Sequence, residues 1–425
     1  MVNKIATFQS SETKKQLRLL NIFWMGFILY SLGYAISVTT IGISIPFCPI
    51  IQLVGLVLML SIFGLVEFKT DNYYLSTIFV LYCIWVSAII LRGFSSFSDY
   101  TFIRGFFLDP RGGGILYFSP IILLFPRNLL FYKKLFQVII ILGLAYIIFN
   151  VLFIKEILNS DYESATSQTI VEIFSELAFA SGFILLTFFI HSKKHQLTAL
   201  LVITVAILIA MARARRGLLL MYSNMALVSY MIYILHSKKR YFVLYITIFL
   251  VIVSALYING VYRPHNNHLF GYLLERGDED TRSAVEIYFY DDMKTKDWII
   301  GKGINGEYFA PDIEKEQLTN YRSNIETGYL QTILKGGLIS LGLFILIAVP
   351  ALLKGIFYSR NILSKAAGIW ILMALINSYP STVNTFTLRY LLVWISIGIC
   401  YSKEIRQMEN SYIKDIINPI QVLSK

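Results

Sequence analysis

The sequence is poor in charged residues and very poor in cysteine. Only 15% of its 425 residues are charged and 56% are hydrophobic, whereas a soluble domain has about 25% charged and about 45–50% apolar residues. This composition excludes an ordinary soluble domain and indicates an integral membrane protein. The three cysteines lie in apolar runs without paired spacing, so they indicate neither a disulfide framework nor a zinc site. They are Cys48, Cys83 and Cys400.

Long apolar runs take up most of the chain. A helix needs about 20 apolar residues to cross a hydrocarbon core about 30 Å thick, and the runs lack the period-two alternation of barrel strands. We therefore predict an all-α polytopic membrane protein with nine spans in residues 1–258, one large external loop at 259–327, and three further spans and a tail in 328–425. The twelve transmembrane helices are expected at about 19–37, 41–64, 75–92, 113–126, 135–154, 170–190, 197–212, 217–236, 241–258, 328–352, 364–380 and 387–401.

The distribution of positive residues indicates the orientation of these spans, because Lys and Arg are retained on the cytoplasmic side. With both termini on one side, that side holds 20 of the 37 Lys and Arg residues, and the opposite side holds nine when the long loop is omitted. The sequence thus predicts cytoplasmic termini. The outer side is richer in Arg, which grips phosphate with a planar set of donors. This favours a phosphorylated ligand outside, although a topological preference for Lys inside would give the same bias.

Three arginines interrupt the apolar sequence between the seventh and eighth predicted spans, in MARARRGLLL at 211–220. A charge at the centre of a bilayer costs about 2.5–3.5 kcal/mol on insertion scales, so cations at such a tight turn are unfavourable against lipid. We predict that Arg213, Arg215 and Arg216 face a water-filled cavity that holds an anion. The alternative is that their side chains extend to lipid headgroups at the interface.

Two carboxylates stand out in the sixth predicted span. Glu172 and Glu176 are four residues apart, so they share one helical face. They are expected at the depth of the arginine cluster, where they would orient the guanidinium groups or bind sugar hydroxyls. A structural ion pair between helices is the competing interpretation.

The external loop is the strongest candidate for a chemical domain, because it holds 13 of the 26 acidic residues of the chain. Residues 278–293 carry apolar side chains among charges, which predicts a short helix lying against the outer surface of the membrane region. Val285, Ile287, Tyr288 and Tyr290 are among the apolar residues of this segment.

The loop continues with a run of three glycines, Gly301, Gly303 and Gly306. Glycine permits tight turns and close approach of the backbone, and we predict a structured turn here, with phosphate binding by backbone amides as the alternative. His265 and His268 are the only external histidines; no third ligand is indicated nearby, so we expect an ordinary polar loop start and no metal site.

Three segments resemble motifs of the bacterial O-antigen polymerase and ligase superfamily, the Wzy-type polymerases in particular. ARRGLLL after the seventh span resembles the Arg-Gly motif of that family. Residues 280–308 are similar to its long-loop pattern of an Arg, an amphipathic helix and Gly-x-Gly, and ETGYLQTILKGGLISL at 326–341 is similar to its His-Asn-x-x-Leu-Gln segment. In order and spacing the motifs cover roughly 211 to 341, and the first six spans match in hydropathy alone.

This resemblance implies a GT-C-like glycosyltransferase in the bacterial cytoplasmic (inner) membrane, with its active site facing the periplasm. It implies polymerisation of polysaccharide repeat units carried on undecaprenyl diphosphate, without cofactor, nucleotide sugar or metal. Arginines would stabilise the charge that grows on the diphosphate leaving group, while a base deprotonates the attacking hydroxyl. Expected partners are the lipid-linked oligosaccharides and the bilayer; a chain-length regulator protein is left open, and no nucleic acid is expected.

The resemblance carries Arg216 and Arg282 over as catalytic diphosphate contacts. Charge and position add further diphosphate-binding arginines, and three residues are assigned to orienting the substrate. The added arginines are Arg213, Arg215, Arg263 and Arg322, and the orienting residues are Glu172, Glu176 and Tyr329.

Glu326 stands where the ligases of this superfamily carry a His. A carboxylate there would serve as the catalytic base, especially if partial burial raises its pKa, and the change favours a polymerase over a ligase. Alternatively, Glu326 caps a helix beginning at Thr327, because acids are favourable near a helix N-terminus.

Three rival functions remain: an O-antigen ligase, a transporter or flippase of the lipid-linked oligosaccharide, and a non-catalytic partner of a glycan assembly complex. Against the transporter, the halves of the sequence show no internal repeat and no pair of matched broken helices. In the tail, Ile413, Ile416 and Ile417 share one helical face and predict a short interfacial helix ending before Pro419.

Overall fold

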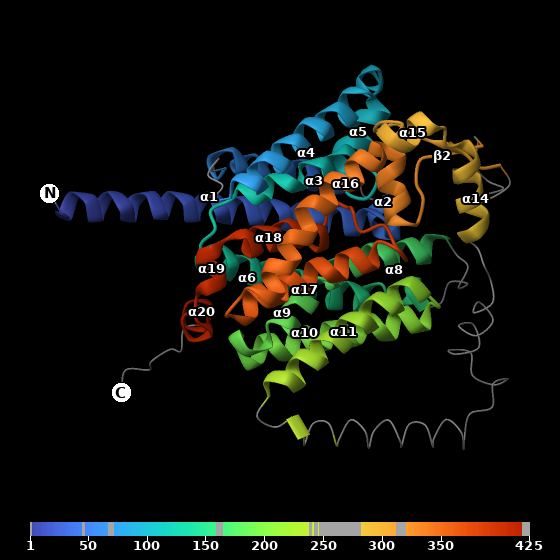
Figure 1. The fold of residues 1–425 in the computed structure, drawn as a ribbon. Coiled ribbons are helices and arrows are strands. Elements are labelled where there is room, and N and C mark those ends of the chain that lie inside the picture. The colour runs from blue at the N-terminus through green and yellow to red at the C-terminus, as the bar shows by residue number, and fades with distance from the viewer. Residues whose placement is uncertain are drawn as a thin grey trace, which may run out of the picture. The chain divides into compact units, whose positions relative to one another are not determined.

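The computed structural model describes residues 2–44, 47–66, 72–158, 165–237, 240–241, 245, 282–311 and 320–418. In these ranges the regular structure is helical apart from one short antiparallel strand pair. Clustering of contacts divides the chain into two compact units, residues 1–139 with 280–425 and residues 140–279, and helix α6 (Leu129–Leu152) runs from one into the other (Figure 1).

The N-terminal helices of the first unit pack through glycine. The helices α1 (Val2–Ser37) and α3 (Phe47–Met59) make the most extensive helix contact of this unit. A Cβ on Gly26 would lie 2.6 Å from the carbonyl oxygen of Gly55, and a Cβ on Gly55 would lie 2.6 Å from that of Gly26. Small residues let two apolar helices approach at backbone distance, so this pair sets how closely α1 and α3 pack.

The chain then forms a series of shorter elements before α6. The amphipathic segment after α4 was not expected to be helical; there Phe97 packs on Phe102 and Phe106 with ring centroids 5.0 Å apart. The predicted fourth span is a 3-10 helix with Pro120 inside, which explains its short length. These elements are α2 (Thr40–Ser44), η1 (Leu60–Gly64), α4 (Tyr73–Leu91), η2 (Phe94–Ser98), α5 (Tyr100–Leu108) and η3 (Gly114–Leu124).

The C-terminal helices complete the first unit around α18 (Leu388–Tyr401), in which every residue is buried. The helices α16 (Gly328–Phe357) and α17 (Ile362–Asn377) both pack on it. Trp394 of α18 has aromatic contacts with α4 and α16, at 5.2 Å from Tyr82 and 5.9 Å from Phe344. A helix buried on all sides can be apolar all round, which explains the lack of polar periodicity in this segment.

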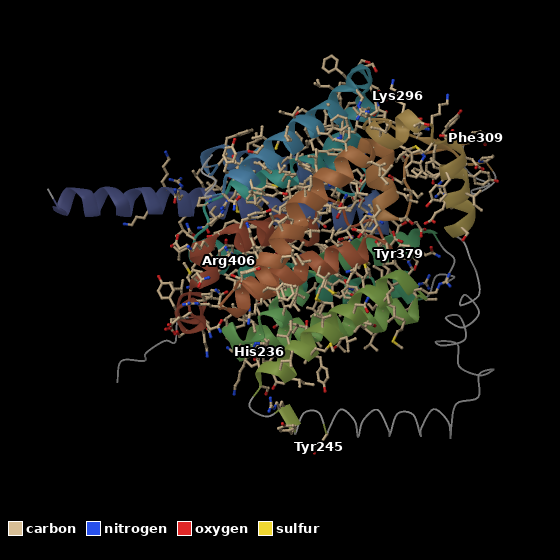
Figure 2. The ribbon with its side chains drawn as sticks, viewed as in Figure 1. His236, Tyr245, Lys296, Phe309, Tyr379 and Arg406 are labelled. Carbon is tan, nitrogen blue, oxygen red and sulfur yellow. The ribbon has the colours of Figure 1, made fainter. Side chains whose placement is uncertain are left out.

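The tail packs on protein through α19 (Lys403–Gln407) and α20 (Asn410–Ile417). The guanidinium of Arg406 donates to the carbonyl of Tyr358 at 2.9 Å (Figure 2). The helix ending before Pro419 is confirmed, but Ile413 and Ile417 are buried against the protein. The amide of Asn361 donates to the carbonyls of residues 405 and 408, which ties this end of the chain to α17 and so directs the apolar face of α20 inward.

The described part of the predicted 259–327 loop is a small folded layer. It consists of α14 (Arg282–Asp292), α15 (Thr295–Ile300) and the strands β1 (Tyr308–Phe309) and β2 (Tyr321–Arg322), which pair with Tyr308 opposite Arg322. The predicted helix is confirmed over residues 282–292. The helix buries Phe289, and Met293 directly after its end is also buried, whereas Ile287 and Tyr290 are exposed. Helical spacing of four residues aligns Val285, Phe289 and Met293 on one side, and Ile287 cannot share that side.

The second unit contains the rest of α6, then α7 (Ile154–Leu158), α8 (Ala165–Ala178), α9 (Ser181–Leu186), η4 (Phe188–Ile190), α10 (Lys193–Ala212) and α11 (Arg216–His236). The segment from α8 to α9 is its most buried part. The hydroxyl of Tyr222 on α11 donates to the carbonyl of Ser175 on α8 at 2.7 Å, which joins the two helices inside the unit.

Eight helices among the described residues are long and apolar enough to cross a membrane, which confirms an all-α polytopic membrane protein. Three further predicted spans coincide with the shorter apolar helices 114–124, 362–377 and 388–401. The predicted span at 241–258 lies almost entirely outside the described residues, as do Arg263, His265 and His268. The total of twelve spans therefore stays a prediction. The long spans are Lys14–Ser37, Phe47–Gly64, Tyr73–Leu91, Leu129–Leu152, Ser167–Leu186, Lys193–Ala212, Arg216–His236 and Gly328–Phe357.

Candidate functional site

Helix α16 is broken at Gly337, which has φ 69° and ψ −176°. Such a break leaves carbonyl groups without helical partners, and membrane interiors offer no water to replace them. Here the amides of Lys302 and Gly303 donate to the carbonyls of Leu334 (2.7 Å) and Lys335 (2.9 Å). The indole of Trp85 on α4 donates to the carbonyl of Gly336 at 2.8 Å. The 301–306 segment and α4 thus satisfy the exposed backbone of the break.

The turn at residues 301–306 supplies the two backbone amides that donate to the break. Gly301 and Gly303 have φ values of 68° and 85°, which favour glycine. In return, the ammonium of Lys335 donates to the carbonyls of Ile304 (3.0 Å) and Gly306 (2.8 Å). The structured turn predicted at 301–306 is confirmed.

The alternative of phosphate binding by the amides of this turn is wrong for most of them. The amides of Gly301, Lys302, Gly303, Ile304 and Gly306 all donate to protein carbonyls. A backbone amide has a single hydrogen to donate, so these groups hold the turn on α4 and α16 and are not available to a phosphate.

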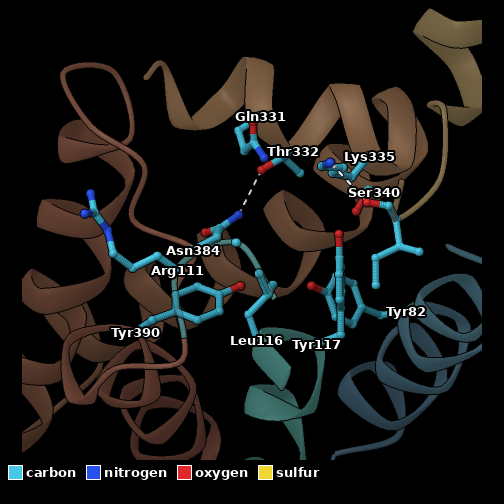
Figure 3. Close-up of a pocket in the computed structure, with 12 residues that line it drawn as sticks. Tyr82, Arg111, Leu116, Tyr117, Gln331, Thr332, Lys335, Ser340, Asn384 and Tyr390 are labelled. Atoms are coloured by element: carbon cyan, nitrogen blue, oxygen red, sulfur yellow. Dashed lines mark hydrogen bonds between the residues drawn. The ribbon is translucent and has the colours of Figure 1, made fainter. Parts of the chain in front are cut away.

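A cavity of about 590 Å³, counted with its opening, lies beside the break in α16 (Figure 3). Five parts of the first unit form its wall: α4, the 111–117 segment, the 301–306 turn, the N-terminal half of α16, and the segment from Asn384 into α18. The cavity is lined by Tyr82, Arg111, Gly112, Leu116, Tyr117, Ile304, Gln331, Thr332, Lys335, Ser340, Asn384 and Tyr390.

The polar groups of this wall converge from separate elements. In Figure 3 the hydroxyl ends of Tyr82, Tyr117 and Tyr390 point toward the interior, and the three are close enough to interact electrostatically. On the α16 side, the amide of Asn384 donates to the hydroxyl of Thr332 at 2.8 Å. This bond fixes the amide, leaving its carbonyl oxygen as an acceptor.

Asp109 holds the turn that carries Arg111. Its carboxylate accepts the backbone amides of Arg111 (2.9 Å) and Gly112 (3.0 Å). The guanidinium of Arg111 points away from the tyrosine hydroxyls in Figure 3.

The start of α16 brings two carboxylates near each other. The hydroxyl of Thr327 donates to Oε1 of Glu286 on α14 at 2.5 Å, and Glu326 is the exposed neighbour of Thr327. Helix α16 begins at Gly328 with Thr327 as its N-cap residue, one position later than expected, and Thr327 makes no side-chain cap bond. Gln331 fixes this corner, since its side-chain oxygen accepts the amide of Ile325 at 2.9 Å.

The other predicted residues of this unit lie around the same corner or close to it. Arg282 is the first residue of α14, one helical turn before Glu286, and is placed by its backbone alone. Arg322 is a partly buried residue of β2. The hydroxyl of Tyr329 donates to the carbonyl of Leu375 on α17, so it holds the two helices together.

The arginine cluster lies in the second unit, in a turn made possible by Ala214, which has φ 49°. Arg213 ends α10 and is 3% exposed, and burial lowers its pKa. Arg215 is the N-cap residue of α11; it forms an ion pair with Glu172 and donates to the side-chain oxygen of Gln168 at 2.9 Å. Arg216 begins α11 and is exposed.

The predicted residues are thus divided between the two units. Arg213, Arg215, Arg216, Glu172 and the half-buried Glu176 belong to the second unit, and the described members of the loop and α16 belong to the first. Their convergence on one pocket stays a prediction. The sequence analysis did not single out Glu286 or the cavity tyrosines. A lone tyrosine in an apolar run carries no periodic signal. Of the cavity residues, Lys335 is the one whose charge stands out within an apolar predicted span.

The helical fold, the arginine cluster of the second unit and the polar cavity of the first define a polytopic helical membrane protein with polar sites between its helices. Comparison with family models, with characterised proteins and with solved structures finds no match for this chain.

Proposed function

We propose that this protein is a metal-independent membrane glycosyltransferase that polymerises lipid-linked polysaccharide repeat units. The donor is a glycan on undecaprenyl diphosphate and the acceptor is a second lipid-linked repeat unit. The protein then belongs to the bacterial cytoplasmic membrane with both termini in the cytoplasm and the site facing the periplasm. The order of the three motifs between 211 and 341 supports this assignment.

The observation that carries the proposal is the placement of Arg215 and Arg216 at the N-terminus of α11. The positive end of a helix dipole disfavours cations and favours an anion. Glu172 pairs with Arg215 and so aligns its guanidinium. A diphosphate at this turn would interact favourably with both the helix end and the arginines, including the buried Arg213.

The chemistry needs a leaving group, an attacking hydroxyl and a base. The acceptor oxygen forms a bond to the anomeric carbon while the bond from that carbon to the diphosphate oxygen breaks, and the acceptor proton passes to a carboxylate. Arg216 of the second unit is proposed to stabilise the charge that develops on the diphosphate. For Arg282 of the first unit, the sequence resemblance implies the same role. Glu326 is the proposed base, and Thr327, the next residue in the chain, donates its hydroxyl to Glu286.

One observation favours a transporter as the second candidate. Transporters bind substrates at discontinuous helices, and α16 is discontinuous at Gly337. However, the carbonyls at this break accept hydrogen bonds from Lys302, Gly303 and Trp85, so they are occupied by protein donors. A fixed, filled break is better suited to shaping a site than to coordinating a transported ion.

A strain lacking this gene, complemented with variants, tests the proposal through the ladder of surface polysaccharide on a gel. Arg216→Ala and Arg282→Ala should abolish long chains and leave single repeat units attached, because loss of one charge-assisted contact slows turnover by about tenfold to a hundredfold. Arg360→Ala, at an exposed arginine after α16, is the matched control and should keep the ladder.

The same gel separates a polymerase from the alternatives. A ligase defect and a transport defect both leave no repeat attached at the surface, whereas a polymerase defect leaves one. Normal ladders in both arginine variants, at wild-type membrane levels, would refute the assignment.

A further inference from the structure

Polar side chains, among them three tyrosines, line the cavity beside α16. Tyr82 and Tyr390 are buried, and in Figure 3 the hydroxyl ends of Tyr82, Tyr117 and Tyr390 all point toward the interior of the cavity.

The groups on the wall match a ligand rich in hydroxyls. A phenol hydroxyl both donates and accepts, as a sugar hydroxyl does, and the amide oxygen of Asn384 adds an acceptor. Leu116 and the aromatic rings supply apolar surface for the faces of a sugar ring.

The wall suits an anion less well. Lys335 is its only buried cation, and two of the three ammonium hydrogens are already donated to the carbonyls of Ile304 and Gly306. The guanidinium of Arg111 points away from the tyrosine hydroxyls. Neutral donors and acceptors therefore dominate the interior.

We propose that this cavity is a sugar subsite that holds an uncharged sugar ring of the lipid-linked glycan through Tyr82, Tyr117 and Tyr390. The inference rests on the proposed glycosyl transfer and assigns the glycan to a place distinct from the arginine turn. Gln331 and Thr332 lie in the segment that also contains Glu326, so a ring held here is anchored on the helix that begins beside the proposed base.

Binding to the full-length protein in lipid nanodiscs tests the subsite. The probe is the repeat-unit oligosaccharide of the host, freed from lipid and diphosphate by mild acid, observed by saturation-transfer NMR and calorimetry; inorganic pyrophosphate is the second probe. Tyr390→Phe and Tyr117→Phe each remove one hydroxyl and keep the ring, so the fold is retained. Each should weaken oligosaccharide binding about fivefold, as expected for one hydrogen bond, and leave pyrophosphate binding unchanged.

Tyr401→Phe is the matched control, because Tyr401 is a buried tyrosine on the same helix whose hydroxyl donates to the carbonyl of Ile347 at 3.3 Å. It should bind the oligosaccharide as the wild type does. Wild-type affinity in both Tyr390→Phe and Tyr117→Phe, or no saturation transfer to the wild type at millimolar oligosaccharide, would overturn the subsite. Displacement of the oligosaccharide by pyrophosphate, with pyrophosphate binding lost in the two variants, would also overturn it, by making the cavity an anion site.

The outcome is separable from that of the proposed function. Normal ladders in Arg216→Ala and Arg282→Ala would refute polymerisation, while tyrosine-dependent oligosaccharide binding would still support a glycan site in the cavity.

Discussion

Gly301 lies against the backbone of Gly337, the residue at which α16 changes direction. A Cβ built on Gly301 would lie 2.6 Å from the amide nitrogens of both Gly336 and Gly337. Both Gly301 and Gly337 also have positive φ. The 301–306 turn and the break in α16 therefore form one joint, in which neither backbone leaves room for a side chain.

Replacing Gly301 by Ala should destabilise the protein. The positive φ alone costs about 1–3 kcal/mol for a residue with a Cβ, and the close contact with α16 adds to this cost because backbone cannot move aside as a side chain can. We expect a lower thermal midpoint in detergent, measured by fluorescence-detected size exclusion, and a lower membrane level. Gly342→Ala in α16 is the control, since a Cβ there would meet nothing within 4 Å. Equal midpoints for the two variants would contradict the joint.

The ion pair between Arg215 and Glu172 allows a structural role of Arg215 to be tested separately from its proposed role in binding the diphosphate. Either single charge reversal should lower the membrane level, because it places like charges in contact. The double reversal, Arg215→Glu with Glu172→Arg, restores an ion pair between α8 and α11 and should restore the level. Chain-length ladders should remain defective, since the double reversal puts a carboxylate at the N-terminus of α11 where the diphosphate is proposed to bind. A double variant with a full ladder would assign Arg215 a structural role alone.

Hydropathy was sufficient to predict the helical membrane fold, because the ability of a run to cross lipid depends on its own side chains. It could not predict the break at Gly337. That conformation depends on the amides of Lys302 and Gly303, which are distant in sequence and reach the freed carbonyls only in the folded protein. The Gly-Gly pair in ILKGGL indicates backbone freedom but not its partner.

The residues of the candidate site also differ in whether the sequence could predict them. Residues whose charge is unusual for their surroundings, such as Arg213 and Glu172, could be singled out from sequence. Tyr82, Tyr117 and Tyr390 resemble the many other tyrosines of the chain, and only their convergence from three elements distinguishes them. The face of α14 was misjudged because apolar residues occur on several sides of that helix, and burial of Phe289 is decided by its contact with Tyr308 at 5.6 Å.

The two carboxylates at the start of α16 should respond differently to neutral replacement. Glu326→Gln removes the proposed base and should abolish polymerisation, whereas Glu326→Asp keeps a carboxylate and should retain part of it. Glu286→Gln can still accept the hydrogen bond from Thr327 and should affect chain length less than Glu326→Gln does. The ladder gel and the membrane level measure both effects. If Gln and Asp at 326 are equally tolerated, Glu326 is not the base and a role at the helix N-terminus remains.

His191 makes the second unit sensitive to acid. Burial, with a smaller contribution from the neighbouring His195, lowers the pKa of His191 from 6.5 to about 3, and its Nε2 atom lies 2.9 Å from the hydroxyl of Thr187. Between these two pKa values the unfolded chain binds a proton that the folded protein does not, so stability falls as the pH drops below about 6.5. At pH about 5 the loss is about 2 kcal/mol.

Thermal unfolding in detergent at pH about 7.5 and about 5 measures this loss. His191→Gln has no proton to gain, so the difference between its two midpoints should be smaller than in the wild type. His236→Gln is the control, because His236 is an exposed histidine at the end of α11 (Figure 2), and it should keep the full wild-type difference. An unchanged pH difference in His191→Gln would show that another group senses acid, since the protonation of a single buried imidazole is the only step that this variant removes.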